Sequence, residues 1–364
     1  MKIAHVVDSM EVGGAEMLVL QMCHLQREHG HDPSVYAIAK LGPLGERMRA
    51  EGFAVQANVG RHLSDSMRNF FRIFKDATPD VVHLHNPTPT IYAGLSARAA
   101  GVPSIVSTRH SLVAPPHKVA AEFKYALAAR SCDWIVGICD ATTSNVKGLH
   151  TVPTRKLACI YNGAAPLQRA AESALPPKGG FTLLFVGRLE PIKNHGLLLR
   201  SFCEALKAMP ELRLWMVGDG SERRALEAQA EDLGIAAQVT FWGQQLDVAP
   251  FFSAADAFIM SSRSEGLPIS LLQGFSLGLP AIVTDVGGMA EVVRLSQAGR
   301  IVSATDSHEM AKAILDMATN SAEREKFSKN AIESFQARFS LQTMVAAYMD
   351  LYRSTPRARR KAKR

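Results

Sequence analysis

The sequence lacks the usual signatures of metal and disulfide sites. It has five cysteines but no C-x-x-C pair, and neither H-E-x-x-H nor D-x-D occurs. An odd number of cysteines in a chain of 364 residues is typical of reduced thiols in a core and not of a disulfide framework. We therefore expect no bound metal and no other cofactor.

An uninterrupted apolar segment is also missing. The longest stretch without Asp, Glu, Lys or Arg covers 266–284, and Pro268, Gly274, Gly278 and Pro280 divide it into a helix and a strand. The apolar run that opens the chain is too short for a signal peptide. We expect a cytoplasmic protein without a membrane span.

Positive charge is concentrated in one short segment. Lys plus Arg number 41 against 34 Asp plus Glu, and six of these cations lie in 356–364. Without that segment the excess falls to one positive charge, which argues against a nucleic-acid-binding surface. The basic tail could hold the protein on the inner face of an anionic membrane. A disordered, solubilising tail is the alternative.

Short β-branched runs alternate with helical periodicity, a pattern typical of βαβ units. A segment at 163–180, rich in Pro and Gly, interrupts the pattern, which then resumes. The sequence predicts an α/β protein with two Rossmann-like, doubly wound parallel sheets facing each other across a cleft, and a C-terminal helix that crosses back to the first domain. The predicted bounds are 1–165 for the first domain, 166–337 for the second, 338–353 for the returning helix and 354–364 for the tail. Strands are predicted at 2–7, 33–39, 53–58, 80–85, 103–108, 134–138, 181–187, 212–218, 238–243, 257–262 and 280–285.

Ligands of parallel sheets bind at the carboxyl ends of the strands, and several predicted strand ends carry suitable residues. Gly13 and Gly14 follow the first strand and precede a helix, whose N-terminus favours anions. An ordinary β–α turn would also use glycine. Arg188 and Lys193 follow the first strand of the second domain and could clamp a diphosphate. Charged residues on a solvated turn are the alternative.

Glu265 follows the predicted strand at 257–262 and precedes Pro268, which suits the first turn of a helix. The backbone amides of Gly266 and Leu267 would lie beside this carboxylate, which can accept hydrogen bonds from sugar hydroxyls. An acid that only stabilises the helix dipole is the alternative.

Two histidines lie at neighbouring strand ends of the first domain. His85 and His110 occur there with Asn86 and Arg109, which favours a functional site at this edge of the sheet. Side-chain alternation along the strand is expected to point His83 inward, so we expect His83 to have a structural role. A buried, hydrogen-bonded histidine is the commoner outcome for any one of them.

Together these segments resemble glycosyltransferase family 4. The resemblance extends to about residue 353 and rests on VGGAE, HLHNP, STRHS, FVGRLEPIKN, LWMVGDGSE, VTFWG and SSRSEGLPISLLQGFSLGLPAIVTDVGGMAEVV. It implies the GT-B architecture, a nucleotide-sugar donor and retention of anomeric configuration.

The resemblance also implies roles for single residues. Arg188 and Lys193 match the pair that binds the donor diphosphate, and Glu265 matches the first acid of an E-x7-E motif that contacts donor-sugar hydroxyls. His110 matches a histidine near the donor sugar. Since the resemblance makes the first domain the acceptor-binding one, His85, Asn86 and Arg109 are expected on the acceptor side. The other donor-site matches are glycines: Gly13 and Gly14 near the diphosphate, Gly243 at the base, and Gly287 and Gly288 along the cleft.

One position departs from the family pattern. Gln273 stands where the motif has its second glutamate, which binds the ribose. An amide can donate and accept hydrogen bonds but has no charge to strengthen them. We expect ribose binding to be weaker by roughly 1–2 kcal/mol.

We expect a metal-independent hexosyltransferase that uses a UDP- or GDP-sugar. Its acceptor would be a hydroxyl of a glycan or lipid-linked saccharide, in bacterial cell-surface polysaccharide or lipopolysaccharide biosynthesis. Since clustered carboxylates are missing, cations would neutralise the leaving phosphate; the expected catalytic residues are Arg188, Lys193, Glu265 and His110. The alternatives are a non-catalytic or weakly active nucleotide-sugar-binding subunit, suggested by Gln273, and another GT-B enzyme such as a nucleotide-sugar epimerase.

Overall fold

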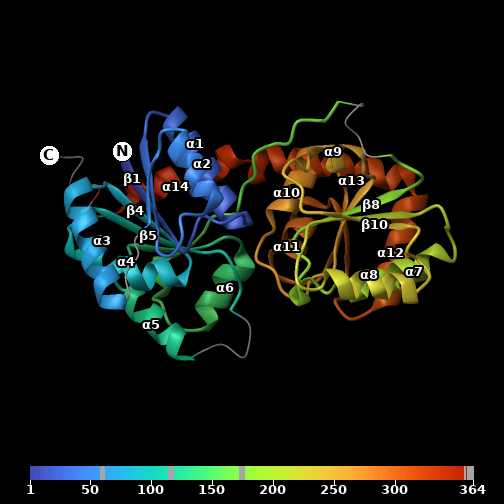
Figure 1. Ribbon diagram of the computed structural model, residues 1–364, viewed down its shortest axis with the longest axis horizontal. Helices are drawn as coiled ribbons and strands as arrows, with labels where there is room; N and C mark the ends of the chain where they lie inside the picture. Colours follow the sequence, from blue (N-terminus) through green and yellow to red (C-terminus); the bar gives the residue numbers. More distant parts are fainter. Residues whose placement is uncertain (58–61, 114–118, 172–176, 356–357, 359–364) are drawn as a thin grey trace. The chain divides into compact units, whose positions relative to one another are not determined.

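The chain forms two α/β units (Figure 1). The computed structural model describes residues 1–57, 62–113, 119–171, 177–355 and 358. Unit 1 consists of Met1–Gly163 and Leu341–Arg364, and unit 2 of Ala164–Ser340. The boundary predicted after residue 165 lies two residues beyond this division. Most of the basic tail predicted at 354–364 lies outside the described residues.

Unit 1 contains a seven-stranded parallel sheet, in the order β3-β2-β1-β4-β5-β6-β7. Its strands are β1 (Lys2–Val7), β2 (Asp32–Ala37), β3 (Ala54–Ala57), β4 (Val81–His85), β5 (Ser104–Arg109), β6 (Trp134–Gly137) and β7 (Leu157–Cys159). Its helices are α1 (Gly14–Glu28), α2 (Gly42–Ala50), α3 (Leu63–Ala77), α4 (Pro87–Ala99), α5 (Val119–Ala129), α6 (Asp140–Gly148) and α14 (Leu341–Ser354). The six strands predicted for this domain are confirmed, and β7 is an addition.

Side-chain alternation along β4 separates the two faces of this sheet. Val82 and Leu84 lie in a buried core with Phe70 and Phe74 of α3. His83 and its neighbour on the same face, His85, point instead toward the side covered by α1 and α14. The face under α1 and α14 is therefore the one that carries buried polar side chains.

Unit 2 contains a six-stranded parallel sheet, in the order β10-β9-β8-β11-β12-β13. Its strands are β8 (Thr182–Val186), β9 (Arg213–Val217), β10 (Val239–Gly243), β11 (Ala257–Met260), β12 (Ala281–Thr284) and β13 (Gly299–Val302). Its helices are α7 (His195–Leu206), α8 (Arg223–Asp232), α9 (Ala249–Ala254), α10 (Ile269–Ser276), α11 (Gly287–Ser296), α12 (Ser307–Thr319) and α13 (Ser321–Ser334). The five strands predicted here are confirmed, and β13 is an addition.

Each sheet has a point at which the strand order reverses. In unit 1 it lies between β1 and β4, and in unit 2 between β8 and β11. The connections leave such a pair of strands in opposite directions, and the space outside their carboxyl ends is where open α/β sheets bind ligands. Several of the predicted site residues lie at the ends of these strands or after them: Gly13, Gly14, His85 and Asn86 in unit 1, and Arg188, Lys193 and Glu265 in unit 2.

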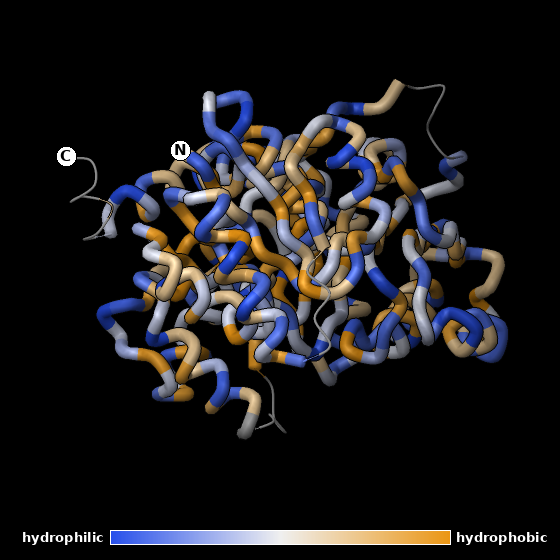
Figure 2. The backbone as a smooth tube through the Cα atoms, turned by 60° about the vertical axis from the view of Figure 1, so that its left-hand side comes forward, coloured by the Kyte–Doolittle hydropathy of each residue, from blue (hydrophilic) through white to orange (hydrophobic). Residues whose placement is uncertain are grey.

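Helix α14 returns the chain to unit 1 after a π-helical turn at Phe335–Phe339. It begins at Leu341, three residues later than predicted, and buries an apolar stripe that includes Met344, Val345 and Tyr348. Along the described residues, hydrophobic and hydrophilic segments of the backbone alternate at short intervals (Figure 2), as helices with one buried face require. No helix in the described ranges is both long and apolar enough to cross a bilayer.

Candidate functional site

In unit 2, hydrogen bonds hold the loops after β8, β11 and β12 together. The backbone N–H of Arg263 donates to the carbonyl of Ile192 over 2.9 Å, and that of Gly288 donates to the carbonyl of Gly266 over 2.7 Å. The predicted residues Gly266, Gly287 and Gly288 therefore lie at one edge of the sheet, beside the loop that carries Glu265.

Lys193 and Glu265 meet at this edge. The Lys193 ammonium donates a hydrogen bond to Glu265 Oε1, and Ser262 Oγ donates to the same oxygen over 3.2 Å. The two charged side chains are only 14% and 15% exposed, so each provides most of the local charge compensation for the other. The two residues are 72 positions apart and were predicted separately, but they form an ion pair in the structure.

Arg188 lies on the same loop as Lys193 but has an exposed side chain. No ion pair of this guanidinium is found in the described part of the chain. The loop therefore presents a positive charge that is available to an anion, next to a lysine that is already paired.

Glycine backbone contacts bring β8, β9 and β10 together at the same edge. A Cβ on Gly218 would lie 1.9 Å from the carbonyl oxygen of Gly187, so only glycine fits there. The N–H of Gly218 also donates to the carbonyl of Gly243 over 2.8 Å. The predicted base-side residue Gly243, at φ +67°, therefore lies at the strand ends that also carry Arg188.

The remaining predicted residues of unit 2 lie close to Glu265 along the chain. Leu267 is buried, at 3% exposure. Gln273 lies in α10 and is half-buried. No side-chain hydrogen bond of Gln273 is found within the described ranges, so its amide is available to a ligand.

In unit 1, α1 begins at Gly14, with Gly13 as its extended N-cap residue. A Cβ on Gly14 would meet no atom within 4 Å, so the backbone is open to an approaching ligand there. The carboxylate of Glu16 folds back toward Gly13, where a Cβ would lie 2.3 Å from Glu16 Oε2. An acid therefore lies against the helix N-terminus that was predicted to receive an anion.

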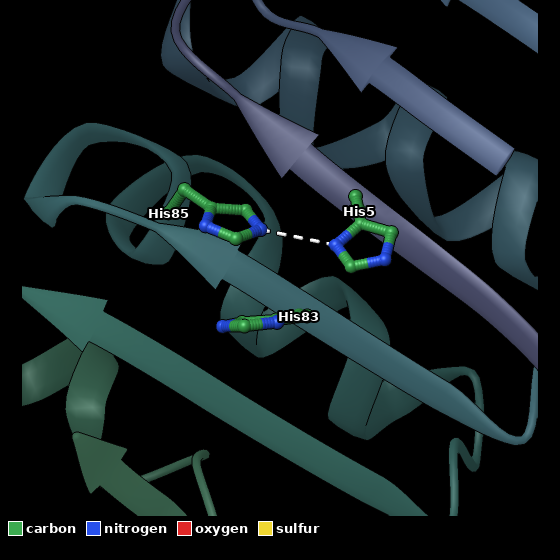
Figure 3. Close-up of side chains that lie close together, drawn as sticks. All are labelled: His5, His83 and His85. Atoms are coloured by element: carbon green, nitrogen blue, oxygen red, sulfur yellow. Dashed lines mark hydrogen bonds between the residues drawn. The ribbon is translucent and has the colours of Figure 1, made fainter. Parts of the chain in front are cut away.

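A row of imidazoles crosses the point of strand reversal between β1 and β4. His5 Nδ1 lies 3.0 Å from His85 Nε2 (Figure 3), and His85 Nδ1 lies 3.1 Å from His110 Nε2. At its other nitrogen, His5 Nε2 lies 2.9 Å from Gln26 Oε1 of α1. The predicted pair His85 and His110 is thus connected, and His5 and Gln26 extend the row into the core.

Burial keeps these imidazoles neutral near pH 7. Desolvation lowers the pKa of His5 and of His110 to about 4 and the pKa of His83 and His85 well below the ordinary value. His110 is therefore a neutral hydrogen-bonding group here, and not a cation that could balance a phosphate.

His83 connects the sheet to α14. Its Nδ1 lies 2.7 Å from the Tyr352 hydroxyl, and its Nε2 lies 2.7 Å from Thr108 Oγ1. Thr108 Oγ1 in turn lies 2.9 Å from the Tyr348 hydroxyl. These contacts support the structural role that was expected of His83.

The nitrogens of His5, His83 and His85 lie within 4.8 Å of one another, a spacing that a metal ion could bridge. All six ring nitrogens nevertheless have hydrogen-bond partners: Gln26, Thr108, Tyr352, His110 and, for one pair, each other. A metal would have to displace several of these bonds, so the contacts fit a neutral polar network better than a metal site. The absence of a metal stays a prediction.

The two other residues predicted on the acceptor side differ in accessibility. Asn86 is half-buried at φ +79°, and its Oδ1 accepts a hydrogen bond from the backbone N–H of His110 over 3.2 Å. Arg109 is 3% exposed. Its guanidinium lies 3.1 Å from Glu122 and 4.5 Å from the ring centroid of Tyr125. Arg109 therefore holds α5 on the sheet, with its charge already balanced.

Three residues near the site were not predicted: His5, Gln26 and Asp8. Asp8 follows β1, and partial burial raises the pKa of its carboxyl above the ordinary value, against a hydrogen bond with Thr88 that lowers it. Asp8 could have been predicted, because ligands of parallel sheets bind at the carboxyl ends of the strands and Asp8 directly follows β1. No local signal marks Gln26, because a glutamine in an amphipathic helix is ordinary.

Comparison with known proteins identifies the same two units. The model described as "Glycosyltransferase Family 4" matches residues 12–166, and the model described as "Glycosyl transferases group 1" matches residues 168–334. Over 357 residues, the chain is 26% identical to the lipopolysaccharide core biosynthesis glycosyltransferase LpsD of Rhizobium meliloti (strain 1021), a match that covers 97% of this chain and 98% of that protein.

Two further similarities differ in extent. The chain is 33% identical over 180 residues to the lipopolysaccharide core biosynthesis glycosyltransferase LpsE of the same organism, which covers 50% of this chain and 52% of LpsE. Among solved structures, Anabaena Alr3699/HepE in complex with UDP has a TM-score of 0.87 at 18% identity, and the match covers 97% of this chain and 100% of that chain.

Proposed function

Because the chain belongs to glycosyltransferase family 4 and has the two Rossmann-like units of the GT-B fold, we propose that it transfers a hexosyl unit from a UDP-sugar. The acceptor is a hydroxyl of a lipopolysaccharide core or lipid-linked saccharide, and anomeric configuration is retained. The names of LpsD and LpsE support a lipopolysaccharide core as the acceptor. The UDP bound in the Anabaena structure supports UDP as the nucleotide of the donor.

One observation carries the proposal: Lys193 and Glu265 form a charged pair at the strand reversal of unit 2, and Arg188, near Lys193 on the loop after β8, has no ion pair with any of the residues that the structure describes. The acceptor hydroxyl attacks the anomeric carbon, the bond from that carbon to the diphosphate breaks, and the proton goes to the leaving phosphate. Negative charge grows on that phosphate, where Arg188 and Lys193 stabilise it. Glu265 accepts hydrogen bonds from the sugar hydroxyls. These groups provide the charge stabilisation without a divalent ion.

A donor screen tests this function. In a thermal-shift titration, UDP-hexoses raise the melting temperature because they bind the native state only. Slow release of UDP from a UDP-hexose then demonstrates bond cleavage, and it continues in EDTA. Stabilisation by GDP-sugars alone would overturn the assignment of the base, and complete inhibition by EDTA would overturn the metal-independent mechanism.

A second candidate is a nucleotide-sugar-binding subunit without catalysis, which Gln273 in place of a carboxylate favours. It predicts stabilisation by UDP-hexoses with no release of UDP for any acceptor. The same screen separates the two functions, because only a transferase cleaves the donor.

We also propose that unit 1 binds an anionic membrane that carries the acceptor. Phe123 and Leu127, four residues apart in α5, are 70% and 50% exposed, so they can enter a lipid interface together. The basic segment 356–364 would add electrostatic attraction. Leu246 of unit 2, at 99% exposure, provides a control site.

Sedimentation with vesicles that contain anionic lipid tests the membrane contact. We expect Phe123→Ser with Leu127→Ser, or removal of residues 356–364, to reduce the sedimented fraction, and Leu246→Ser to leave it unchanged. Equal sedimentation of all variants would refute the contact.

A further inference from the structure

Four side chains of unit 1 form a continuous hydrogen-bond chain that ends at His110. The donor–acceptor distances are 2.9 Å from Gln26 to His5, 3.0 Å from His5 to His85 and 3.1 Å from His85 to His110. Gln26 and His5 are completely buried, and His85 is 3% exposed. Figure 3 shows the central contact, between rings from adjacent strands β1 and β4.

Each bond in this chain fixes the next one. A neutral imidazole carries one N–H and one lone pair in the ring plane, so it donates from one nitrogen and accepts at the other. With Gln26 Oε1 as acceptor, His5 donates from Nε2 and must accept at Nδ1. His85 then donates from Nε2 and accepts at Nδ1, so His110 donates from Nε2.

This order places the lone pair of His110 on Nδ1. No hydrogen bond to that nitrogen is found in the described part of unit 1, so Nδ1 is available to a ligand. The pairing of one ring nitrogen decides the tautomer and therefore the chemistry of the other. A lone pair on Nδ1 selects a hydroxyl, which can donate a hydrogen bond, over a phosphate oxygen, which cannot.

The orientation of the Gln26 amide determines which side chain donates and which accepts in each of these hydrogen bonds. The other amide atom of Gln26, Nε2, is buried and has no hydrogen-bond partner among the residues described. Only the contact with His5 therefore orients the amide. Rotating the amide by half a turn would make Gln26 a donor, reverse all three bonds and place a proton on His110 Nδ1.

We propose that Gln26, His5 and His85 are positioning residues that hold His110 in the Nε2–H tautomer, so that Nδ1 accepts a hydrogen bond from a hydroxyl of the substrate sugar. The sugar in this assignment rests on the proposed function. The assignment of the tautomer does not rest on it, because the contacts that fix the tautomer all lie between side chains of unit 1.

Nitrogen-15 NMR of the full-length protein labelled at histidine measures the tautomer directly. Long-range proton–nitrogen correlations, assigned with single His→Gln variants, should show at pH 7.5 a protonated Nε2 and an unprotonated Nδ1 for His5, His85 and His110. We expect Gln26→Met to produce a mixture of tautomers at His110 and to lower kcat/KM for the donor by about tenfold. Gln26→Glu, whose carboxylate can only accept, should restore the single tautomer.

Gln21→Met is the matched control, because Gln21 lies on the same helix and outside the chain; it should change neither the spectrum nor kcat/KM. A proton on His110 Nδ1 in the wild type, or an unchanged His110 signal in Gln26→Met, would overturn the proposal. A stoichiometric metal ion in the purified protein would also overturn it, since ligation consumes the ring nitrogens. If the spectra agree but no nucleotide sugar is cleaved, the proposed function fails and the assignment of the tautomer stands.

Discussion

The side chains of Lys193 and Glu265 pair directly, although one follows β8 and the other follows β11. The pair lies where the strand order of unit 2 reverses. A cation proposed for the diphosphate and a carboxylate proposed for the sugar therefore neutralise each other. In the proposed function, a donor that brings its own negative charge to Lys193 frees Glu265 for the sugar hydroxyls.

Replacing Lys193 tests this arrangement. Lys193→Ala should lower kcat by about 10²–10³-fold, because one preorganised charge at the leaving group is lost. Turnover is measured as UDP release at saturating donor, with the melting temperature as a check on folding. Lys178→Ala is the control, since Lys178 pairs with Asp256 at a more exposed place in the same unit, and it should keep full turnover. Normal turnover in Lys193→Ala would refute the role of Lys193.

Gln273 provides a test of the ribose contact. Gln273→Glu should strengthen UDP binding by roughly 5–30-fold, because a carboxylate forms stronger hydrogen bonds to the ribose hydroxyls. Gln273→Ala should weaken it. Titration calorimetry with UDP and with its 2′,3′-dideoxy analogue separates the ribose contribution, since the analogue should bind all variants alike. Unchanged UDP affinity in Gln273→Ala would show that the residue does not contact the ribose.

The buried histidines predict loss of stability in mild acid. Below pH 6.5 the unfolded chain binds protons that folded His5 takes up only near pH 4, so the free energy of unfolding falls as the pH falls through this range. His5 alone accounts for about 2 kcal/mol between pH 7.5 and 5, and the lowered pKa values of His83, His85 and His110 act in the same direction. Urea unfolding at pH 7.5, 6 and 5 measures the effect. A constant free energy of unfolding between pH 7 and 5 would contradict it.

The contact between Tyr352 and His83 predicts how strongly α14 is anchored. Tyr352→Phe removes the hydroxyl that is hydrogen-bonded to buried His83 Nδ1 and should lower the free energy of unfolding by about 1–3 kcal/mol. Tyr161→Phe is the control, because the hydroxyl of Tyr161 binds Asp140 at an exposed position, and it should cost less than about 0.5 kcal/mol. Equal effects in urea unfolding would mean that the buried contact adds no stability.

The sequence predicted the parts of the site that follow from local pattern. Lys193 and Glu265 could be selected because each follows a clear β-branched strand, and parallel strands end at one edge of their sheet. The short strands β7 and β13 escaped prediction, since three or four residues at mostly half-buried positions carry little periodicity. Local sequence pattern also did not fix the exact boundary between the two units, because that boundary depends on packing.

The chain from Gln26 to His110 shows why the remainder could not be predicted. Its members lie in α1, β1, β4 and after β5, and only the register of β1 against β4 brings His5 beside the two histidines of β4. Arg109 was predicted as a site residue, but its charge is balanced by Glu122, which lies 13 residues further along the chain. Spacing alone does not tell a balanced cation from an available one.

The return of α14 has a consequence for synthesis on the ribosome. His83 and Thr108 obtain their hydroxyl partners from Tyr352 and Tyr348, which are translated after all of unit 2. Until then one face of the first sheet has polar groups without their native partners and an apolar strip without its cover. Unit 2 can complete its fold from one continuous segment, whereas unit 1 cannot cover this face of its sheet until α14 has been synthesised.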